Sequence, residues 1–157
     1  MGTQVTNIKI HFSTNVEPIL NQDAPALSYT SSFIPIIKLN IFTYSIMGKS
    51  KNFVNMTGAP TLSQVEQGIL LLLRNSNVQY IYNVKIDSIS MLEKNVKFSI
   101  DAFRSNSKYL VKSHPTFKGI TLKHRKKGIS MNYFEASGKA VYMGLRCPLD
   151  IKEFHDV

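Results

Sequence analysis

Apolar residues recur at helical spacing in one segment, PTLSQVEQGILLLL, which starts at Pro60. They fall at positions i, i+4, i+7 and i+8, which lie along one face of a helix. Ser63 and Glu66 have the spacing of a capping box, so the pattern predicts a helix that starts near Ser63. The residues of the apolar stripe are Val65, Ile69, Leu72 and Leu73.

Other segments alternate between apolar and polar residues or are rich in β-branched and aromatic residues, as half-buried strands are. The clearest are NIFTY, KNFVNM, GITLKH and ISMNYF. Between the last two, Lys126, Lys127 and Gly128 predict an exposed basic turn. Strands of this kind together with a long helix predict an α+β fold.

The pattern occurs twice. Gly48–Lys49 is followed by an alternating stretch, Gly58 and a helix start, and Gly138–Lys139 is followed by the same order with Gly144. The Gly-Lys pairs are 90 residues apart and the later glycines 86, so the first hairpin is expected to be four residues longer. Further upstream in each copy, TNIKIHFS (residues 6–13) resembles VKIDSISM (residues 84–91).

The chain is therefore predicted to be a single domain, 1–157, made of two repeats, about 1–78 and 79–157. Each repeat is expected to hold a strand, a short helix, several antiparallel strands and a long helix. The last helix, starting at Pro148, is expected to be short. Two such copies predict a pseudo-two-fold domain with one shared sheet.

Composition narrows the class of protein. With 43% hydrophobic residues, the chain has enough apolar side chains for a core. Its longest apolar run, Ile69–Leu73, is far below the ~18 to 20 residues of a membrane span. The single cysteine, Cys147, excludes a disulfide framework or a cysteine zinc site within one chain and favours an intracellular location.

The net charge of +9 is unevenly distributed. From Lys108 to Arg146 there are nine Lys or Arg and one acid, Glu135, whereas residues 1–80 hold five basic residues and three acids. A basic surface of this kind favours a polyanion such as nucleic acid, although a solvated charged face would also account for it.

The segment FKGITLKHRKKGISMNYFEASGKAVYMG resembles the second repeat of the TATA-box-binding protein family. It has a Phe-x-Gly start, a basic turn, a second strand that ends in Phe, and Ser-Gly-Lys. Phe117 and Phe134 are 17 residues apart, the family spacing. TNIKI and MTGAP resemble the first repeat, so the resemblance covers nearly the whole chain. It is that of a diverged member, of the type that large DNA viruses carry.

The resemblance implies a saddle-shaped fold whose curved antiparallel sheet faces DNA, with helices on the convex face. The implied partners are A·T-rich double-stranded promoter DNA, general transcription factors and the RNA polymerase machinery. It implies no cofactor, metal, membrane or small-molecule substrate, and a location in the nucleus or at a site of viral transcription, in host cytoplasm or virion.

The resemblance also implies roles for single residues. Phe117 and Phe134 would wedge between base pairs, Asn7 would bond base edges, and Ser88 departs from the asparagine expected at its place. Met143 departs likewise from its counterpart Thr57. The implied DNA-binding set is Asn7, Phe42, Thr57, Ser88, Phe117, Lys123, Arg125, Phe134, Lys139 and Val141.

The wedge of the first repeat stays open. Phe42 ends LNIF, where one wedge is expected, but Pro25 stands 17 residues earlier. Phe33 is a substitute with different geometry. Glu135 follows Phe134 directly and would repel phosphate if it faced DNA.

Three function classes follow. The first is a transcription initiation factor that binds and bends promoter DNA. The second is a protein-interaction platform of the same fold with weak or non-specific DNA binding, which Ser88 and Met143 favour. The third, an enzyme, has little support, because His11, His114, His124 and His155 are scattered without metal-ligand spacing.

Overall fold

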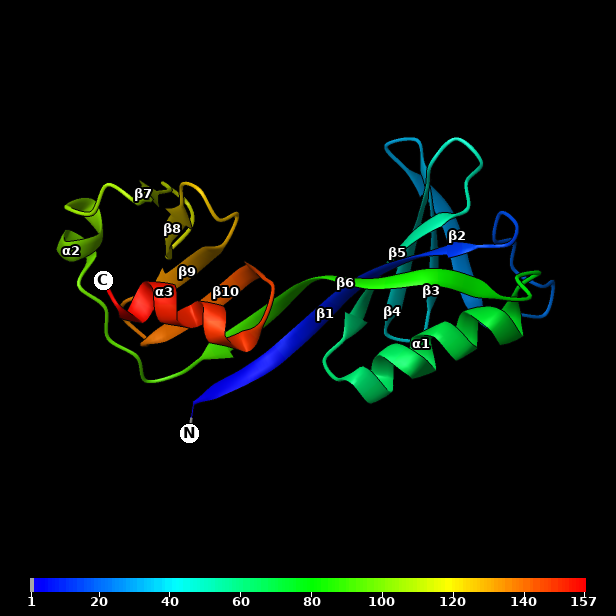
Figure 1. Cartoon of the computed structure of the whole chain (residues 1–157), viewed down its shortest axis with the longest axis horizontal. Helices are drawn as coiled ribbons and strands as arrows, with labels where there is room; N and C mark the ends of the chain where they lie inside the picture. Colours follow the sequence, from blue (N-terminus) through cyan, green and yellow to red (C-terminus); the bar gives the residue numbers. More distant parts are fainter. Residues whose placement is uncertain (1) are drawn as a thin grey trace. The chain divides into compact units, whose positions relative to one another are not determined.

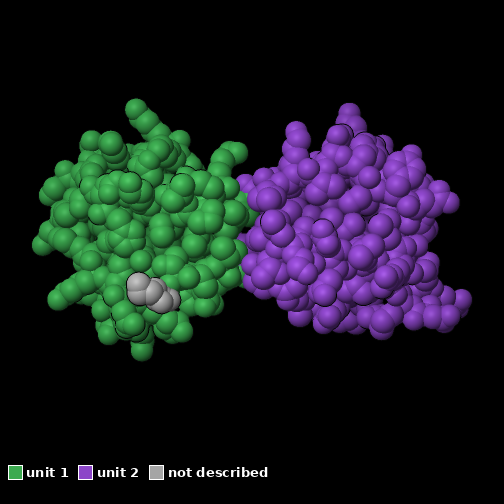
Figure 2. Space-filling view, turned by 60° about the horizontal axis from the view of Figure 1, so that its bottom comes forward, with its two compact units in different colours: residues 1–6, 88–157 green, residues 7–87 purple. Residues whose placement is uncertain are grey.

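The computed structural model describes residues 2–157, which form two compact units (Figure 2). The first-repeat unit comprises residues 7–87, and the second-repeat unit comprises 88–157 together with the chain start up to Thr6. Strands β1 (Thr3–Thr14) and β6 (Ile81–Glu93) each belong to both units. Ten strands form one largely antiparallel sheet in the order β2-β3-β4-β5-β1-β6-β10-β9-β8-β7.

In the first-repeat unit, a helix packs against one face of the antiparallel strands (Figure 1). Its Gly68 comes so close to the sheet that a Cβ there would lie 2.9 Å from the ring of Phe42. The hydroxyl of Tyr44 donates a hydrogen bond to the Gly68 carbonyl. Besides β1 and the start of β6, the elements are β2 (Ala26–Ser31), β3 (Ile34–Leu39), β4 (Phe42–Met47), β5 (Phe53–Ala59) and α1 (Leu62–Asn75).

The alternation of buried and exposed side chains explains these strands. In β1, Ile8, Ile10 and Phe12 are buried and the residues between them are not. The same period of two continues across the neighbouring strands, so one sheet face forms the core under α1. The buried residues of the neighbours include Ile37, Leu39, Phe42, Tyr44, Ile46, Val54 and Met56.

The N-cap of helix α1 lies two residues before the predicted cap. Thr61, in an extended conformation, is the N-cap, and its hydroxyl accepts the N–H of Gln64. Ser63 therefore lies in the first turn, and the predicted capping box is wrong. Thr61 and Gln64 have the same spacing as Ser63 and Glu66, so the sequence pattern alone does not decide between the two caps.

The expected short helix of the first repeat is also absent. The stretch between β1 and β2, all of it described, contains no helix. Hydrogen bonds tie it to the end of α1 instead: the Ile19 N–H donates to Asn77 Oδ1 (2.7 Å), and the Asn21 N–H to the Asn75 carbonyl (2.8 Å). These bonds satisfy backbone groups that a helix would otherwise pair internally.

The second-repeat unit has the same strand order. Read from the outer strand inward, β7-β8-β9-β10-β6 corresponds to β2-β3-β4-β5-β1. It does contain a short helix after its first strand, as predicted. Besides β6, its elements are α2 (Ile100–Arg104), β7 (Tyr109–Ser113), β8 (Ile120–His124), β9 (Ser130–Phe134), β10 (Lys139–Leu145), a 3-10 turn η1 (Pro148–Ile151) and α3 (Lys152–His155).

Aromatic residues fill the core of this unit. Phe103 of α2 and Phe154 of α3 are buried against Tyr109 and Tyr142 of the sheet, with ring centroids 5.0 to 6.3 Å apart. The Tyr142 hydroxyl donates to Glu93 at 2.6 Å, and burial raises the pKa of Tyr142 above its usual value. The short C-terminal helix is thus held by its aromatic side chain rather than by its length.

Gly58 and Gly144 occupy the same place in the two units. Both have a positive φ, 106° and 74°. A Cβ on Gly58 would lie 2.2 Å from the carbonyl oxygen of Ile41, and one on Gly144 would lie 2.5 Å from that of Gly128. In both units a residue without a side chain is required where the strand passes the turn of the neighbouring hairpin.

Gly48 and Gly138, by contrast, are not equivalent. Met47 pairs with Phe53, and Phe134 pairs with Lys139. Gly48 is thus the first residue of its five-residue loop, and Gly138 is the last of its four-residue loop. The loops differ by one residue, and the expected difference of four came from matching the wrong glycines.

Among residues 2–157, no helix has both the length and the apolar character needed to cross a membrane.

Replacing Gly58 by alanine tests the shared glycine position. The left-handed backbone and the overlap with the Ile41 carbonyl should together cost more than about 2 kcal/mol of unfolding free energy. Gly128→Ala is the matched control, because Gly128 also has a positive φ (62°) but would place its Cβ in open space. It should cost only about 1 kcal/mol. Equal losses in urea denaturation would show that the carbonyl contact is unimportant.

Candidate nucleic-acid interface

Each unit has an open face, by which we mean the sheet face opposite its buried core positions. In the second-repeat unit, Asn132 and Phe134 of β9 alternate with the buried Met131 and Tyr133. Val141 of β10 is the cross-strand partner of Asn132, so it shares this face. The open face of this unit thus carries both apolar and polar side chains.

Phe117 and Phe134 form an aromatic pair on this face. Their ring centroids are 5.4 Å apart at an interplanar angle of 70°, an edge-to-face contact. Phe117 is 38% exposed, which is high for a phenylalanine. The 17-residue spacing correctly predicts that the two rings lie side by side.

Gly119 makes room for this pair. A Cβ at this position would lie 2.7 Å from the ring of Phe117 and 3.0 Å from that of Phe134. Only glycine therefore permits both rings to lie against the backbone directly before β8. This gives a physical reason for the Phe-x-Gly sequence.

Two lysines share the open face with the aromatic pair. Lys139 is the direct cross-strand partner of Phe134, and Lys123 is the partner of Ser130. Partners in antiparallel strands lie on the same face, so both lysines belong to the open face. Both are exposed. Glu135 lies away from this face, since it lines hollows with Phe98 next to α2.

The basic turn after β8 belongs to the other side of the unit. The Nδ1 atom of buried His124 accepts the backbone N–H groups of Lys126 and Lys127, each at 3.1 Å. The Lys127 ammonium binds the Glu153 carboxylate on α3, and this hydrogen bond lowers the pKa of Glu153 below its usual value. The basic residues of this unit are thus divided between two faces.

Arg125 lines a hollow of about 460 Å³ together with Lys108, His124 and Glu153. Arg125 thus lies on the side of Glu153 and α3, whereas Lys123 and Lys139 lie on the open face. The turn reverses the chain between β8 and β9, so neighbours in sequence reach different faces.

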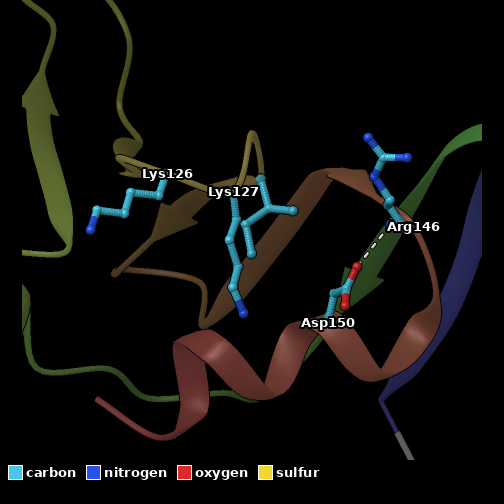
Figure 3. A pocket seen from close by; sticks show the side chains of 5 residues that line it. Lys126, Lys127, Arg146 and Asp150 are labelled. Carbon is cyan, nitrogen blue, oxygen red and sulfur yellow. Dashed lines mark hydrogen bonds between the residues drawn. The ribbon is translucent and has the colours of Figure 1, made fainter.

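A second hollow, of about 350 Å³, lies on the other side of the basic turn (Figure 3). Lys126, Lys127 and Arg146 line it together with Asp150, which accepts the Arg146 backbone N–H at 2.8 Å. This hollow is basic, but it is not part of the open face.

In the first-repeat unit, Asn7 and Thr57 lie near Gly58. The Asn7 side-chain oxygen accepts the Gly58 N–H at 2.9 Å, which leaves the amide NH₂ group as a donor. Ile8 pairs with Ala59 as Ile89 pairs with Leu145, so Ser88 is the positional counterpart of Asn7. Thr57 pairs with Thr43 and adds a second hydroxyl beside it.

Phe42 is not on the open face. It is only 1% exposed and packs under α1, so its side chain cannot contact a ligand of the sheet. The strand register gives Met47 the position of Phe134, because each residue closes its hairpin. Phe33 is 98% exposed, at the tip of the β2–β3 turn. Counting positions back from the hairpin loop, rather than from the end of an apolar stretch, would have identified Met47 as the counterpart of Phe134.

One group of residues on the open face of the first-repeat unit was missed. The Nδ1 atom of His11 is hydrogen-bonded to the Asp87 carboxylate, and its ring lies against Phe53 with centroids 5.0 Å apart. His11 is also the cross-strand partner of Asn55. The alternation of TNIKIHFS could have placed His11 opposite the buried isoleucines, but the sequence does not show its pairing with Asp87.

No cluster of three or more His, Cys, Asp or Glu side chains able to hold a metal ion occurs in the described part of the chain.

The contrast between Phe42 and Phe117 can be tested by stability. Phe42→Ala should lower the unfolding free energy by about 3 to 5 kcal/mol, because it empties a buried site under α1. Phe117→Ala should lower it by less than about 1.5 kcal/mol, since the ring is partly exposed and loses mainly one aromatic contact. Chemical denaturation of both variants measures the difference, and a large loss for Phe117→Ala would make that ring a core residue.

Comparison with protein-family models finds no match, and a comparison with curated protein sequences finds none either. Among solved structures, Methanococcus jannaschii TBP is similar to the chain with a TM-score of 0.71 and 16% sequence identity. The similarity covers 99% of this chain and 95% of that one. At this identity the likeness concerns the fold alone, and this chain has a TBP-like fold.

Proposed function

We propose that this protein is a TBP-like transcription initiation factor that binds and bends A·T-rich promoter DNA through the minor groove. The observation that carries the proposal is the pair Phe117 and Phe134. The two rings lie on the open face of the second-repeat unit, where Gly119 leaves room for them and where Lys123 and Lys139 also lie.

The physical reason is the cost of exposing such a pair. Transfer of two aromatic rings out of water lowers the free energy, and the space between adjacent base pairs offers an apolar environment. Unstacking one base step costs a few kcal/mol, which contacts along bent DNA offset. A·T-rich DNA favours this arrangement because its minor groove lacks the guanine amino group and its TA steps deform easily.

The lysines on this face would contact phosphates and fix the orientation of the protein without reading sequence. The net charge of +9 has the sign that a duplex partner requires. Val141 would pack against the groove, and Asn7, Thr57 and Ser88 would face base edges. Arg125 lies on the side of α3 and is therefore not included in the proposed DNA-binding set.

The proposal includes the finer features implied by the resemblance. These are a pseudo-two-fold saddle with helices on its convex face, repeats of about 1–78 and 79–157, and binding without catalysis. They also include general transcription factors and RNA polymerase as partners, a diverged viral-type origin, and a location in the nucleus or at a site of viral transcription.

One observation favours the alternative, a protein-interaction platform of the same fold. In the first-repeat unit, Met47 stands at the position of Phe134, and Phe42 is buried. This unit therefore lacks a second phenylalanine pair on its open face. Duplex binding that is equally strong for all sequences and leaves the DNA straight would favour the platform.

The wedge role is tested by DNA bending. Phe134→Ala should abolish most of the bend in a doubly labelled A·T-rich duplex, measured by fluorescence resonance energy transfer, because one half of the wedge is lost. Asn132→Ala is a matched control, since Asn132 lies on the same strand and face but has no ring. An unchanged bend with Phe134→Ala would contradict the proposal.

The division of the basic residues is tested by salt dependence. Lys139→Ala should flatten the slope of log affinity against log salt concentration by about 0.9, the value for one phosphate contact. Lys127→Ala should leave the slope unchanged, because Lys127 is bound to Glu153 on the side of α3. Binding titrations over a salt series measure both, and the reverse result would place the DNA on the other face.

A further inference from the structure

We propose that His11 and Asn55 recognise the amino group of a guanine in the minor groove, so that the first-repeat unit prefers one G·C pair within the bound site. This inference rests on the proposed function, because it assumes that the open face meets the minor groove. It adds a base preference that an apolar face does not provide.

The contact with Asp87 sets the hydrogen-bonding character of His11. An ionised carboxylate only accepts hydrogen bonds, so Nδ1 of His11 must carry the hydrogen that it shares with Asp87. In the neutral imidazole, Nε2 is then an acceptor. The Phe53 ring, 5.0 Å away, limits the orientation of the imidazole.

Asn55 presents a second acceptor beside it. Its amide nitrogen donates to the sulfur of Met47, which leaves the side-chain oxygen free to accept. Asn55 and His11 are direct cross-strand partners, and such partners have Cβ atoms roughly 5 Å apart on one face. Nε2 of His11 and Oδ1 of Asn55 thus form a pair of neighbouring acceptors.

The minor groove contains one donor that matches them. A·T pairs present only the acceptors adenine N3 and thymine O2, whereas a G·C pair adds the guanine amino group. Two protein acceptors against an A·T pair would be desolvated without partners, which is unfavourable. Against a G·C pair, the one amino hydrogen that is not used in Watson–Crick pairing can bond to one of these acceptors or be shared between them.

The corresponding position of the second-repeat unit has the opposite character. There the cross-strand partners are Leu92 and Val141, which occupy the places of His11 and Asn55 in the strand register. These side chains offer no acceptor and fit an A·T pair. The two units therefore differ in the base pair that each favours.

The test uses four versions of one base pair that differ only in the minor-groove amino group. G·C and 2,6-diaminopurine·T carry it, while inosine·C and A·T lack it. The varied pair is moved stepwise through an A·T-rich duplex, and affinities are measured at pH 8.5. At one position, the two duplexes with the amino group should bind about five- to tenfold more tightly.

Three variants assign the effect to these residues. The double variant His11→Leu, Asn55→Val copies the second-repeat unit and should lose the preference while retaining binding to A·T duplexes. Asp87→Asn can donate an amide hydrogen to Nδ1, which turns Nε2 into a donor, and should shift the preference towards A·T. Leu92→Ala, the control in the other unit, should keep the preference.

The two proposals fail in different ways. Equal affinity for all four duplexes at every position, with duplex binding and bending retained, overturns this inference alone. A preference that survives the double variant overturns it as well. Absence of binding to any duplex overturns the proposed function and this inference together. Thermal melting of each variant shows whether a change in affinity reflects loss of folding.

Discussion

The structure depends on the period of two in its antiparallel strands. Every second side chain of a strand enters the core, and those between them reach the opposite face. In β1, this gives the core Ile8, Ile10 and Phe12, and leaves His11 for the open face. Burial of each large apolar side chain contributes roughly 1.5 to 3 kcal/mol. Since the core face supplies this stability, the side chains of the open face are free to serve binding.

Much of the architecture could be predicted for this reason. The alternation in GITLKH and ISMNYF identifies strands because it reflects a face buried on one side only. Gly58 and Gly144 mark the repeat in the sequence. At both places the carbonyl of a neighbouring turn leaves no room for a side chain, so glycine occurs in both copies. Phe117 and Phe134 could be paired from their spacing, because β8 and β9 form one hairpin with a short turn.

The errors have a common physical cause, which is that a local pattern does not fix register. Phe42 ends an apolar stretch as Phe134 does, yet it opens its strand whereas Phe134 closes its own. A shift of one residue in a strand moves a side chain to the other face. The Gly-Lys pairs misled the repeat alignment because a turn glycine can begin or end a loop. The contact of His11 with Asp87 joins residues 76 apart, which no local pattern reveals.

The open faces of the two units carry different side chains, and this has a consequence under the proposed function. A pseudo-symmetric protein can bind a duplex in two opposite orientations unless its halves differ in what they contact. Here the acceptors of His11 and Asn55 correspond to Leu92 and Val141 in the other unit. A difference of about 1.4 kcal/mol between orientations gives a tenfold bias. Under the proposed function, a difference of this size between the open faces would give the protein a preferred orientation on its duplex.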